Sequence, residues 1–449
     1  MNRVSENFKI LKSLRIQSSD WNFFDLRVDI PPLSLGSDAS NPHTQYSNAI
    51  ATFHTSGTIG VGACFTLGEG NQYVCAAAEY IVKNLDGFSL ADLLESKWGL
   101  SDVLSNPLQL RWLSPNAGLV QMAAGLIMNT ILDLASKKSG MPAWKFLVHM
   151  ESEELVKLVT IRHLCDEKKI MSVLGSSKDI ASQLDERVWE LEENGVPAYF
   201  TTWIGSDAST IVNEITEVNS RSGIDIFKMK IGSNQEDELV KLREVVEQVS
   251  PSFTFSADAN QRLSYNAARE WLHDLSNMGF LWLEEPFAPD NFLLFRDLSE
   301  ERRIHNWSCQ IATGENCPNL HTAQALMVAG IGRFQADACR MVGLPDAVFS
   351  GVLSMYYGID FTPHAGGAGL DELAPHLQFF HLARVDRSRD IATSLTETIG
   401  FASKFYASPS ITKHGRILAP KESGLLVGYE KSVAEKLIPY RDGVTWLKL

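Results

Sequence analysis

The sequence predicts an α/β protein built as a modified (β/α)8 TIM barrel, with an α+β capping domain formed by the N-terminal block and the C-terminal tail. The first observation is a series of strand-length apolar runs, each ending in a charged or catalytic-type side chain: IFKMK (226–230), FTFSAD (253–258), FLWLEE (280–285), CQIATGE (309–315), RFQAD (333–337) and GIDFTPH (358–364). The second is spacing, because successive runs end 22 to 30 positions apart, which leaves room for one helix and two loops. Polar residues at the C-terminal ends of barrel strands are typical of an active site.

The bulk composition limits the classes of function. A chain of 449 residues accommodates one large domain and a smaller one. Its hydrophobic content of 45% and charged content of 21% are those of an ordinary soluble globular protein. The net charge of −14 argues against general nucleic-acid binding. Acidic residues in an active site would also repel an acidic substrate, so such a substrate requires a bound cation.

Cysteine usage and hydropathy indicate the compartment. The six cysteines show neither a CxxC spacing nor the density of a disulfide framework, which predicts a reduced, cytoplasmic setting. No stretch approaches the roughly 18 uninterrupted apolar residues of a membrane span, so we expect no membrane partner. Residues 1–19 carry four basic residues and one acid, which leaves a targeting segment open. Residues 10–16 (ILKSLRI) alternate as a strand does, and we expect them to form the first strand.

The chain is expected to divide into a capping domain, a barrel that carries the active site, and a return to the capping domain: 1–150, 151–409 and 410–449. Apolar periodicity and turn residues predict strands between 21 and 65, at 155–163 and at 390–397. The same reasoning predicts helices over about 71–94, 118–136, 236–249 and 264–278. Ser264 is the expected N-cap of the last of these helices.

One loop of the predicted capping domain is a candidate lid. The segment 31–43 (PPLSLGSDASNPH) is rich in turn residues and polar side chains. We predict that its part 35–43, including Ser37 and Asp38, closes over the barrel mouth and contacts the substrate. The alternative is a solvated loop with no role in substrate choice.

Two lysines flank Met229 in the first run. Lys228 and Lys230 point to one face of a strand, so both ammonium groups would enter the same site. Each disfavours protonation of the other, and burial acts in the same direction, so a lysine here is a candidate base near neutral pH. The alternative is an edge strand whose lysines face solvent.

Three acids lie at the ends of three successive predicted strands. Asp258, Glu284 and Glu315 would repel one another strongly without a cation, and an oxygen-only ligand set suits Mg²⁺. No set of cysteines and histidines with zinc spacing lies near them. The alternative for each acid is an N-cap or a surface loop residue.

Asp337 and His364 end the last two runs, 27 residues apart. An aspartate that holds one imidazole nitrogen fixes the tautomer and makes the ring more basic. The run HAGGAG (364–369) provides glycines that permit close approach of a ligand. Two bases on opposite sides of a divalent cation predict removal of the proton next to a carboxylate.

These motifs closely resemble the enolase superfamily, in its mandelate racemase subgroup, over nearly the whole chain: FKMKIG, DANQ, WLEEP, ATGE, QADACR and TPHAGG. The resemblance implies that Asp258, Glu284 and Glu315 bind Mg²⁺. It implies that Lys230 is the base on one face of the substrate and that Lys228 lowers its pKa and touches the substrate carboxylate. It also implies that His364, oriented by Asp337, acts on the other face.

Within the subgroup the chain is most similar to the L-fuconate and L-galactonate dehydratases, through QLRWLSP (109–115), TLGEGN (66–71) and GLDE (369–372). This similarity implies a hydro-lyase that acts on an acid sugar. Lys230 would take the C2 proton and His364 would protonate the departing 3-hydroxyl, giving a 2-keto-3-deoxy acid. Glu397 would contact the substrate carboxylate, and Asn260 and Glu372 are further predicted substrate contacts.

The sequence departs from that branch at Pro318-Asn319-Leu320, which replaces a Gln-Asn-Arg-like run, and at Asp371, which precedes Glu372. The catalytic and metal-binding residues of the family are therefore all present, while residues expected to determine specificity differ. The sequence does not identify which sugar is the substrate. Racemisation or epimerisation on the same scaffold, and a catalytically silent relative kept for binding or regulation, are the alternatives. The expected partners are a small acid sugar and further copies of the chain.

Overall fold

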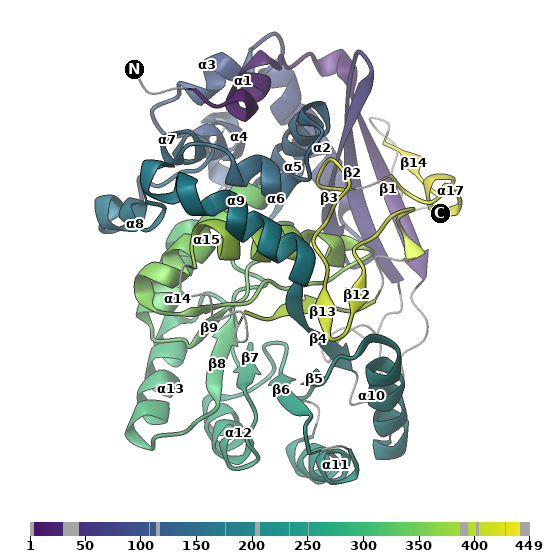
Figure 1. Cartoon of the computed structure of the whole chain (residues 1–449), viewed down its shortest axis with the longest axis vertical. Helices are drawn as coiled ribbons and strands as arrows, with labels where there is room; N and C mark the ends of the chain where they lie inside the picture. The colour runs from purple at the N-terminus through teal and green to yellow at the C-terminus, as the bar shows by residue number, and fades with distance from the viewer. Residues whose placement is uncertain are drawn as a thin grey trace.

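The computed structural model describes residues 4–29, 45–106, 108–113, 117–175, 177–202, 207–232, 234–249, 251–386, 394–400, 404–426 and 428–440. Figure 1 shows a capping domain of helices and an antiparallel sheet above a barrel whose strands are flanked by helices. The candidate residues 35–43, Ser37 and Asp38 lie outside the described residues. The predicted fold class, a modified TIM barrel with an α+β cap, is confirmed.

The barrel consists of parallel strands that pair in chain order: β4 (Val196–Thr202), β5 (Ile226–Lys230), β6 (Thr254–Asp258), β7 (Trp282–Glu284), β8 (Gln310–Thr313), β9 (Arg333–Phe334) and β10 (Asp360–Phe361). β11 (Thr396–Thr398) pairs with β4 from the other side. The helices between successive strands are α10 (Ala208–Ser222), α11 (Gln235–Gln248), α12 (Tyr265–Asn277), α13 (Phe292–Ile304), α14 (Leu320–Val328), α15 (Gly343–Tyr357) and α16 (Leu373–Arg384).

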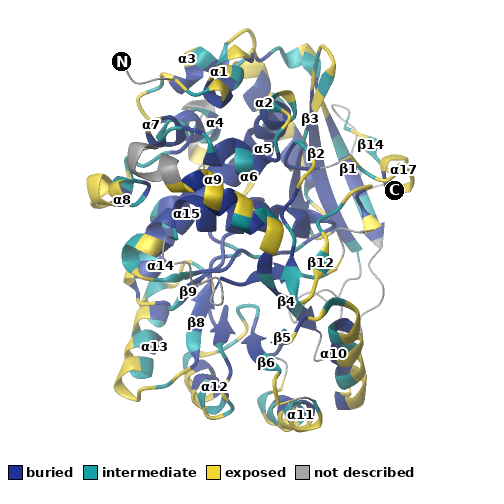
Figure 2. Cartoon of the chain, in the orientation of Figure 1, coloured by how far each residue is buried: buried dark blue, intermediate teal, exposed yellow. Residues whose placement is uncertain are grey.

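The barrel departs from eight regular strand–helix units after β11. In the described part of the chain, the short hairpin β12 (Thr412–Lys413) and β13 (Arg416–Ile417) comes next, and β13 pairs antiparallel with β4. The barrel core is apolar, and Figure 2 shows the strands and the inward faces of the helices buried, with the outer faces of α11 to α13 exposed. All six apolar runs that predicted the barrel supply its strands.

The capping domain is a four-stranded antiparallel sheet in the order β14-β1-β2-β3, with β1 (Trp21–Asp29), β2 (Gln45–Thr55), β3 (Thr58–Thr66) and β14 (Ile438–Pro439). Since β14 pairs with β1, the C-terminal segment lies in the N-terminal sheet. Asp133 strengthens this connection, because its buried carboxylate accepts hydrogen bonds from the backbone amides of Leu425 and Leu426. The domain limits at residues 150 and 409 stay predictions.

The central helix of the cap is α5 (Leu119–Ser139), close to the predicted 118–136. It is long and apolar enough to cross a membrane by length and composition alone, but 89% of that stretch is buried inside the protein. A Cβ on Gly125 would lie 2.5 Å from the Met341 carbonyl oxygen, so glycine lets α5 approach the loop after β9. The apolar character of α5 therefore reflects packing between cap and barrel.

The remaining cap and connecting helices are short or flank the barrel: α2 (Asn71–Asn84), α3 (Leu90–Leu94), α4 (Leu100–Ser105), α6 (Ala143–Val148), α7 (Ser152–Val156), α8 (Glu167–Val173), α9 (Ser177–Asn194) and α17 (Lys431–Ala434). The predicted helix 71–94 is interrupted, because Gly87 adopts a left-handed conformation with φ +82° between α2 and α3. The predicted helices 236–249 and 264–278 are confirmed as α11 and α12, and Ser264 caps α12 by accepting from the Ala267 amide.

Two predicted strands are wrong. Residues 10–16 do not form a strand, because the chain is helical over α1 (Glu6–Ser13), where Ser5 accepts from the Phe8 amide and Phe8 and Leu11 share a buried face. Residues 155–163 are not the first barrel strand. A capping box between Glu151 and Glu154 begins α7 there instead, and β4 is the first barrel strand. Of the predicted strand 390–397, β11 contains only the end, and residues 387–393 lie outside the described residues.

Candidate active site

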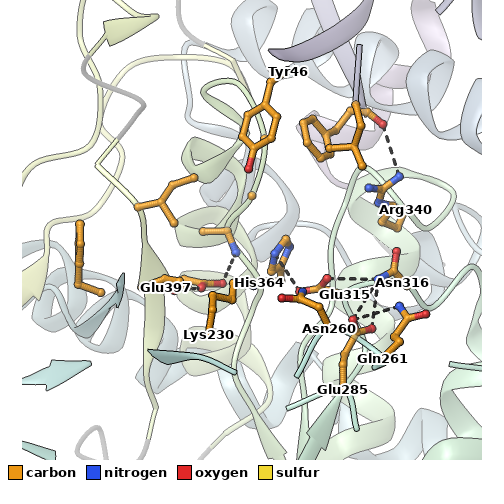
Figure 3. A pocket seen from close by; sticks show the side chains of 18 of the residues that line it. Tyr46, Lys230, Asn260, Gln261, Glu285, Glu315, Asn316, Arg340, His364 and Glu397 are labelled. Atoms are coloured by element: carbon orange, nitrogen blue, oxygen red, sulfur yellow. Dashed lines mark hydrogen bonds and ion pairs between the residues drawn. The ribbon is translucent and has the colours of Figure 1, made fainter. Parts of the chain in front are cut away.

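A cavity of about 290 Å³ opens at the C-terminal ends of the barrel strands, beneath the cap. Its barrel side carries Lys230, Glu315, His364 and Glu397, and its cap side carries residues of β2 and the end of β3. Figure 3 shows these side chains converging, with Tyr46 and Arg340 toward the cap and Lys230 and Glu285 below them. The sequence therefore predicted the position of this cavity from the polar strand ends alone.

The three predicted acids form one cluster. Asp258, Glu284 and Glu315 each offer a carboxylate oxygen, and these oxygens lie within 4.8 Å of one another. The register of the sheet brings them together, because Lys230 is the Cα partner of Asp258 and Asp258 is the Cα partner of Glu284. An all-oxygen set at this spacing, with Glu315 at the cavity wall, fits a hard divalent cation such as Mg²⁺.

Glu284 is the most constrained member of this cluster. Its Oε2 accepts hydrogen bonds from Trp282 Nε1 at 3.0 Å and from Gln335 Nε2 at 2.6 Å. Its Oε1 lies 2.6 Å from Lys228 Nζ. Burial raises the pKa of Glu284 to about 7, although Lys228 opposes that rise. Protein donors thus contact both oxygens of this carboxylate, two of them on Oε2 and Lys228 on Oε1.

The lysines are buried and paired. Lys228 Nζ lies 2.6 Å from Glu284 and 2.8 Å from Glu397, and Lys230 donates to Asp258. Burial lowers the pKa of Lys230, but Asp258 raises it, and the net value lies above the usual range. Lys228 does lower the pKa of Lys230, as predicted, yet the carboxylates outweigh it. The expectation of a lysine poised near neutral pH is therefore not met in this arrangement of the charged groups.

The structure brings Asp337 and His364 together. His364 Nδ1 lies 3.0 Å from Asp337 Oδ2, and its Nε2 lies 3.1 Å from Glu315. Asp337 is itself held by the Cys339 amide, which donates to its other oxygen at 2.6 Å. Burial lowers the pKa of His364, but Glu315 and the hydrogen bond that His364 donates to Asp337 raise it to about 10. This imidazole is therefore held in its protonated form beside the acidic cluster.

The glycines after His364 make room for protein groups. A Cβ on Gly366 would overlap the His364 ring, and one on Gly367 would lie 2.6 Å from the Phe65 ring of the cap. The sequence predicted that this run permits close approach of a ligand. In the structure, the groups that approach these glycines closely are the rings of His364 and Phe65, both of which line the cavity.

The predicted substrate contacts fall into two groups. Asn260 and Glu397 line the cavity. Glu397 accepts from the Ala365 amide at 2.8 Å and pairs with Lys228. Burial raises the pKa of Glu397, but Lys228, His364 and the hydrogen bonds together lower it to about 2. Glu372 is buried and accepts hydrogen bonds from Ser410, outside the residues that line the cavity. Its role as a substrate contact stays a prediction.

Several cavity residues were missed by sequence reasoning. Tyr46, Phe65 and Leu67 come from the cap, and only long-range packing places them here. Leu67 lies within TLGEGN, but nothing in that motif marks it as a cavity residue. Glu285 follows Glu284, has a left-handed φ of +41° and accepts from Gln261 and Asn316. Arg340 ends the QADACR motif. The motifs themselves were the signal that could have identified Glu285 and Arg340. The altered Asn319 caps α14 by accepting from the Thr322 amide.

Comparisons with known proteins agree with this geometry. The family described as "Enolase C-terminal domain-like" matches residues 210–432. The chain is 30% identical over 424 residues to mitochondrial enolase superfamily member 1 of Xenopus laevis, covering 92% of this chain and 93% of that protein. The chain therefore belongs to the enolase superfamily. It is also 30% identical over 435 residues to the L-galactonate dehydratase of Hypocrea jecorina, with 94% of each chain covered.

Solved structures show the same fold. Human mitochondrial enolase superfamily member 1 superposes with a TM-score of 0.86 at 28% identity, covering 98% of this chain and 99% of that one. The L-talarate dehydratase from Polaromonas sp. JS666, complexed with Mg and L-glucarate, superposes with a TM-score of 0.69 at 19% identity, covering 94% and 97%. At that identity the second likeness establishes the fold alone.

Proposed function

We propose that this chain is a Mg²⁺-dependent dehydratase of an acid sugar resembling L-galactonate or L-fuconate, which it converts to a 2-keto-3-deoxy acid. The observation that carries the proposal is that two proton-transfer groups, Lys230 and His364, line one cavity together with Glu315, a member of the acidic cluster. The L-galactonate dehydratase relative at 30% identity supports the same reaction class. A single cavity then has the groups for both removal of a proton and loss of a hydroxyl.

Asp258, Glu284 and Glu315 would hold the Mg²⁺ ion. When bound there, the ion would supply positive charge that makes the carbon next to a substrate carboxylate more acidic. Lys228 and Asn260 lie beside the cluster and would hold the substrate carboxylate in place. The overall negative charge of the protein makes this local positive charge necessary for an acidic substrate.

Lys230 would remove the C2 proton. This role requires a neutral amine, and Asp258 is the group that holds the pKa of Lys230 high. A cation that shares Asp258 would weaken that effect, while burial and Lys228 continue to lower the pKa. The amine then accepts the C2 proton as the bond from C2 to hydrogen breaks.

His364 would deliver a proton to the 3-hydroxyl. Asp337 stabilises the imidazolium form that this step requires. The bond between C3 and oxygen breaks with its electron pair on oxygen, and the proton from His364 makes the leaving group water. The resulting enol becomes the 2-keto-3-deoxy acid by taking a proton at C3. The reaction is a loss of water followed by tautomerisation, so it needs no oxidant or reductant.

A library of mono- and diacid sugars, assayed for 2-keto acid with Mg²⁺ and again with excess EDTA, tests the proposal. We expect one stereochemical series to form 2-keto acid, with activity lost in EDTA and restored by Mg²⁺. Exchange of the C2 proton without 2-keto acid would point to racemisation or epimerisation. Neither exchange nor product from any acid would contradict the enzyme proposal and favour a silent relative.

We further propose a homo-oligomer in the cytoplasm. All six cysteines are free, which agrees with a reducing compartment. The word "mitochondrial" in the names of the relatives makes the mitochondrion the competing location. Light scattering of the purified protein and microscopy of a C-terminal fluorescent fusion test these two statements. A monomeric mass contradicts the first, and a mitochondrial pattern contradicts the second.

A further inference from the structure

Arg340 is a cavity residue to which the proposed chemistry gives no task. It lines the same cavity as Lys230 and His364 but follows the dyad aspartate by three positions in the loop after β9. Figure 3 shows it toward the cap with Tyr46, away from Lys230 and Glu397. A guanidinium in a small cavity presents a permanent positive charge and five N–H donors to whatever binds there.

The partners of Arg340 leave most of these donors unused. Its Nη1 donates to the backbone oxygen of Phe65 at 3.4 Å, a long hydrogen bond. Its guanidinium carbon lies 5.3 Å from the centre of the Phe65 ring. Within the described part of the chain, no carboxylate forms an ion pair with it. A half-buried guanidinium with one weak acceptor favours an oxygen-bearing ligand in the cavity.

Hydrogen bonds fix the backbone of Arg340 in the loop after β9. The Arg340 amide donates to the Asp337 carbonyl at 3.1 Å, and the Arg340 carbonyl accepts from the Gln121 side chain at the start of α5. The Phe65 ring, which forms an edge contact with Tyr46 at 5.0 Å, supports the guanidinium from the cap. The same turn therefore orients the dyad and directs the guanidinium, so little entropy is lost when a ligand binds.

The position of Arg340 specifies which part of an acid sugar it meets. The substrate carboxylate must face the acidic cluster and Lys228, with C2 and C3 between Lys230 and His364. The remaining carbons then extend toward the cap, where Tyr46, Phe65 and Arg340 line the cavity. Of these three, only the guanidinium offers several donors to the oxygen atoms at the far end of the chain.

We propose that Arg340 binds the terminal oxygen of the acid sugar and selects substrates that carry a hydroxyl or carboxylate on C6 over 6-deoxy acids. This inference rests on the proposed function and narrows its substrate class. A site built to donate hydrogen bonds rejects an analogue that lacks the acceptor, because its polar group is then left unpaired in the cavity. L-galactonate-like acids are thereby preferred over L-fuconate-like acids.

A matched series tests the inference. L-fuconate, L-galactonate and galactarate share the arrangement of hydroxyls from C2 to C5 and differ at C6, which is methyl, hydroxymethyl or carboxylate. We expect the wild-type enzyme with Mg²⁺ to show kcat/KM at least about tenfold higher for the better C6-oxygenated acid than for the 6-deoxy acid. The two oxygenated acids show which C6 group is preferred. A higher kcat/KM for galactarate indicates a carboxylate on C6, and a higher kcat/KM for L-galactonate indicates a hydroxyl.

Substitution of Arg340 should remove this preference. We expect Arg340→Met to lower kcat/KM for the preferred oxygenated acid by roughly 10- to 100-fold, and for the 6-deoxy acid by less than about threefold. Arg340→Lys, which keeps the charge, should recover part of the loss. Arg303→Met, at an exposed arginine on α13, is the control and should change neither value. Circular dichroism of each variant checks the fold.

Equal losses for all three acids in Arg340→Met would overturn the inference, as would a wild type that prefers the 6-deoxy acid. If the wild type dehydrates none of the acids, the proposed function fails and calorimetry decides the inference separately. An affinity for an oxygenated acid that falls at least about tenfold in Arg340→Met, with Mg²⁺ present, supports the subsite without turnover. An unchanged affinity, or no binding, overturns it.

Discussion

The barrel side and the cap side of the cavity are built on different principles. On the barrel side, Lys228, Asp258 and Glu284 are fully buried, and Lys228 contacts both carboxylates, which lie one and two strands away in the sheet. On the cap side, the walls are the rings of Tyr46 and Phe65, Leu67 is 42% exposed, and Arg340 has no counter-ion among the described residues. The difference suggests that the barrel side performs the reaction while the cap side selects the substrate.

The two sides also differ in how they are held. Hydrogen-bonded register places Asp258 beside Lys230 and Glu284, so their relative positions follow from the sheet itself. The cap side depends on packing between domains, where Gly125 meets the Met341 carbonyl and Gly367 meets Phe65. Substitutions on the barrel side should therefore abolish activity, and substitutions on the cap side should change the preference among substrates.

The largest effect is expected for Glu284→Gln. Loss of one carboxylate charge from the cluster should lower kcat by ~10³-fold or more and weaken Mg²⁺ binding, with the fold retained. Turnover assays and calorimetry with Mg²⁺ measure the two effects. Asp346→Asn is the control, since burial raises the pKa of Asp346 to about 7, as it does for Glu284, but Asp346 accepts a hydrogen bond from Ser101 and belongs neither to the acidic cluster nor to the predicted substrate contacts. Full activity of Glu284→Gln would contradict the assignment of the metal site.

A smaller effect is expected for Gln335→Leu, which also belongs to the barrel side. Gln335 donates to Glu284 Oε2 and thereby fixes the orientation of this carboxylate within the acidic cluster. We expect Mg²⁺ affinity to fall roughly 10- to 100-fold, as when other groups that orient a metal ligand are removed. Gln324→Leu is the control, because Gln324 is also buried but bonds Tyr357 and the Cys165 backbone. Equal Mg²⁺ affinity in both variants would show that Glu284 needs no such support.

The smallest effect is expected on the cap side, for Phe65→Leu. This change removes the ring beneath Arg340 and loosens the contact with Gly367. We expect kcat/KM for C6-oxygenated acids to fall roughly fivefold, with Mg²⁺ affinity unchanged. Phe53→Leu, a buried ring in the cap sheet outside the cavity lining, controls for general loosening of the cap. A Phe65→Leu variant that loses Mg²⁺ affinity would contradict the separation of the two sides.

The barrel side could be predicted from the sequence because its residues lie at or near the ends of short apolar runs. Lys230, Asp258 and His364 occupy the ends of strands or the positions just after them, and parallel strands bring their ends to one edge. The cap side could not be predicted, because Phe65 and Arg340 lie 275 positions apart and meet only after the domains pack. Local patterns also gave a wrong prediction, since the first four residues of ILKSLRI belong to the capped helix α1 and not to a strand.

The raised pKa of Lys230 is a further feature that the sequence could not predict. The pattern Lys-Met-Lys shows two like charges on one strand face but gives no measure of how near the carboxylates of neighbouring strands lie. The structure places Asp258 in direct contact with Lys230, and this contact outweighs the neighbouring Lys228. The competition between cation and lysine for Asp258 is therefore a property of the folded site.

Proton exchange in deuterated water tests the division of labour on the barrel side most directly. With Mg²⁺ and the best substrate of the acid-sugar library, NMR follows deuterium at C2 and formation of the 2-keto acid. The His364→Asn variant should still exchange the C2 proton while dehydration falls at least about a hundredfold, and Lys230→Ala should lose both. Exchange that persists in Lys230→Ala and stops in His364→Asn would contradict the account and reverse the roles of the two bases.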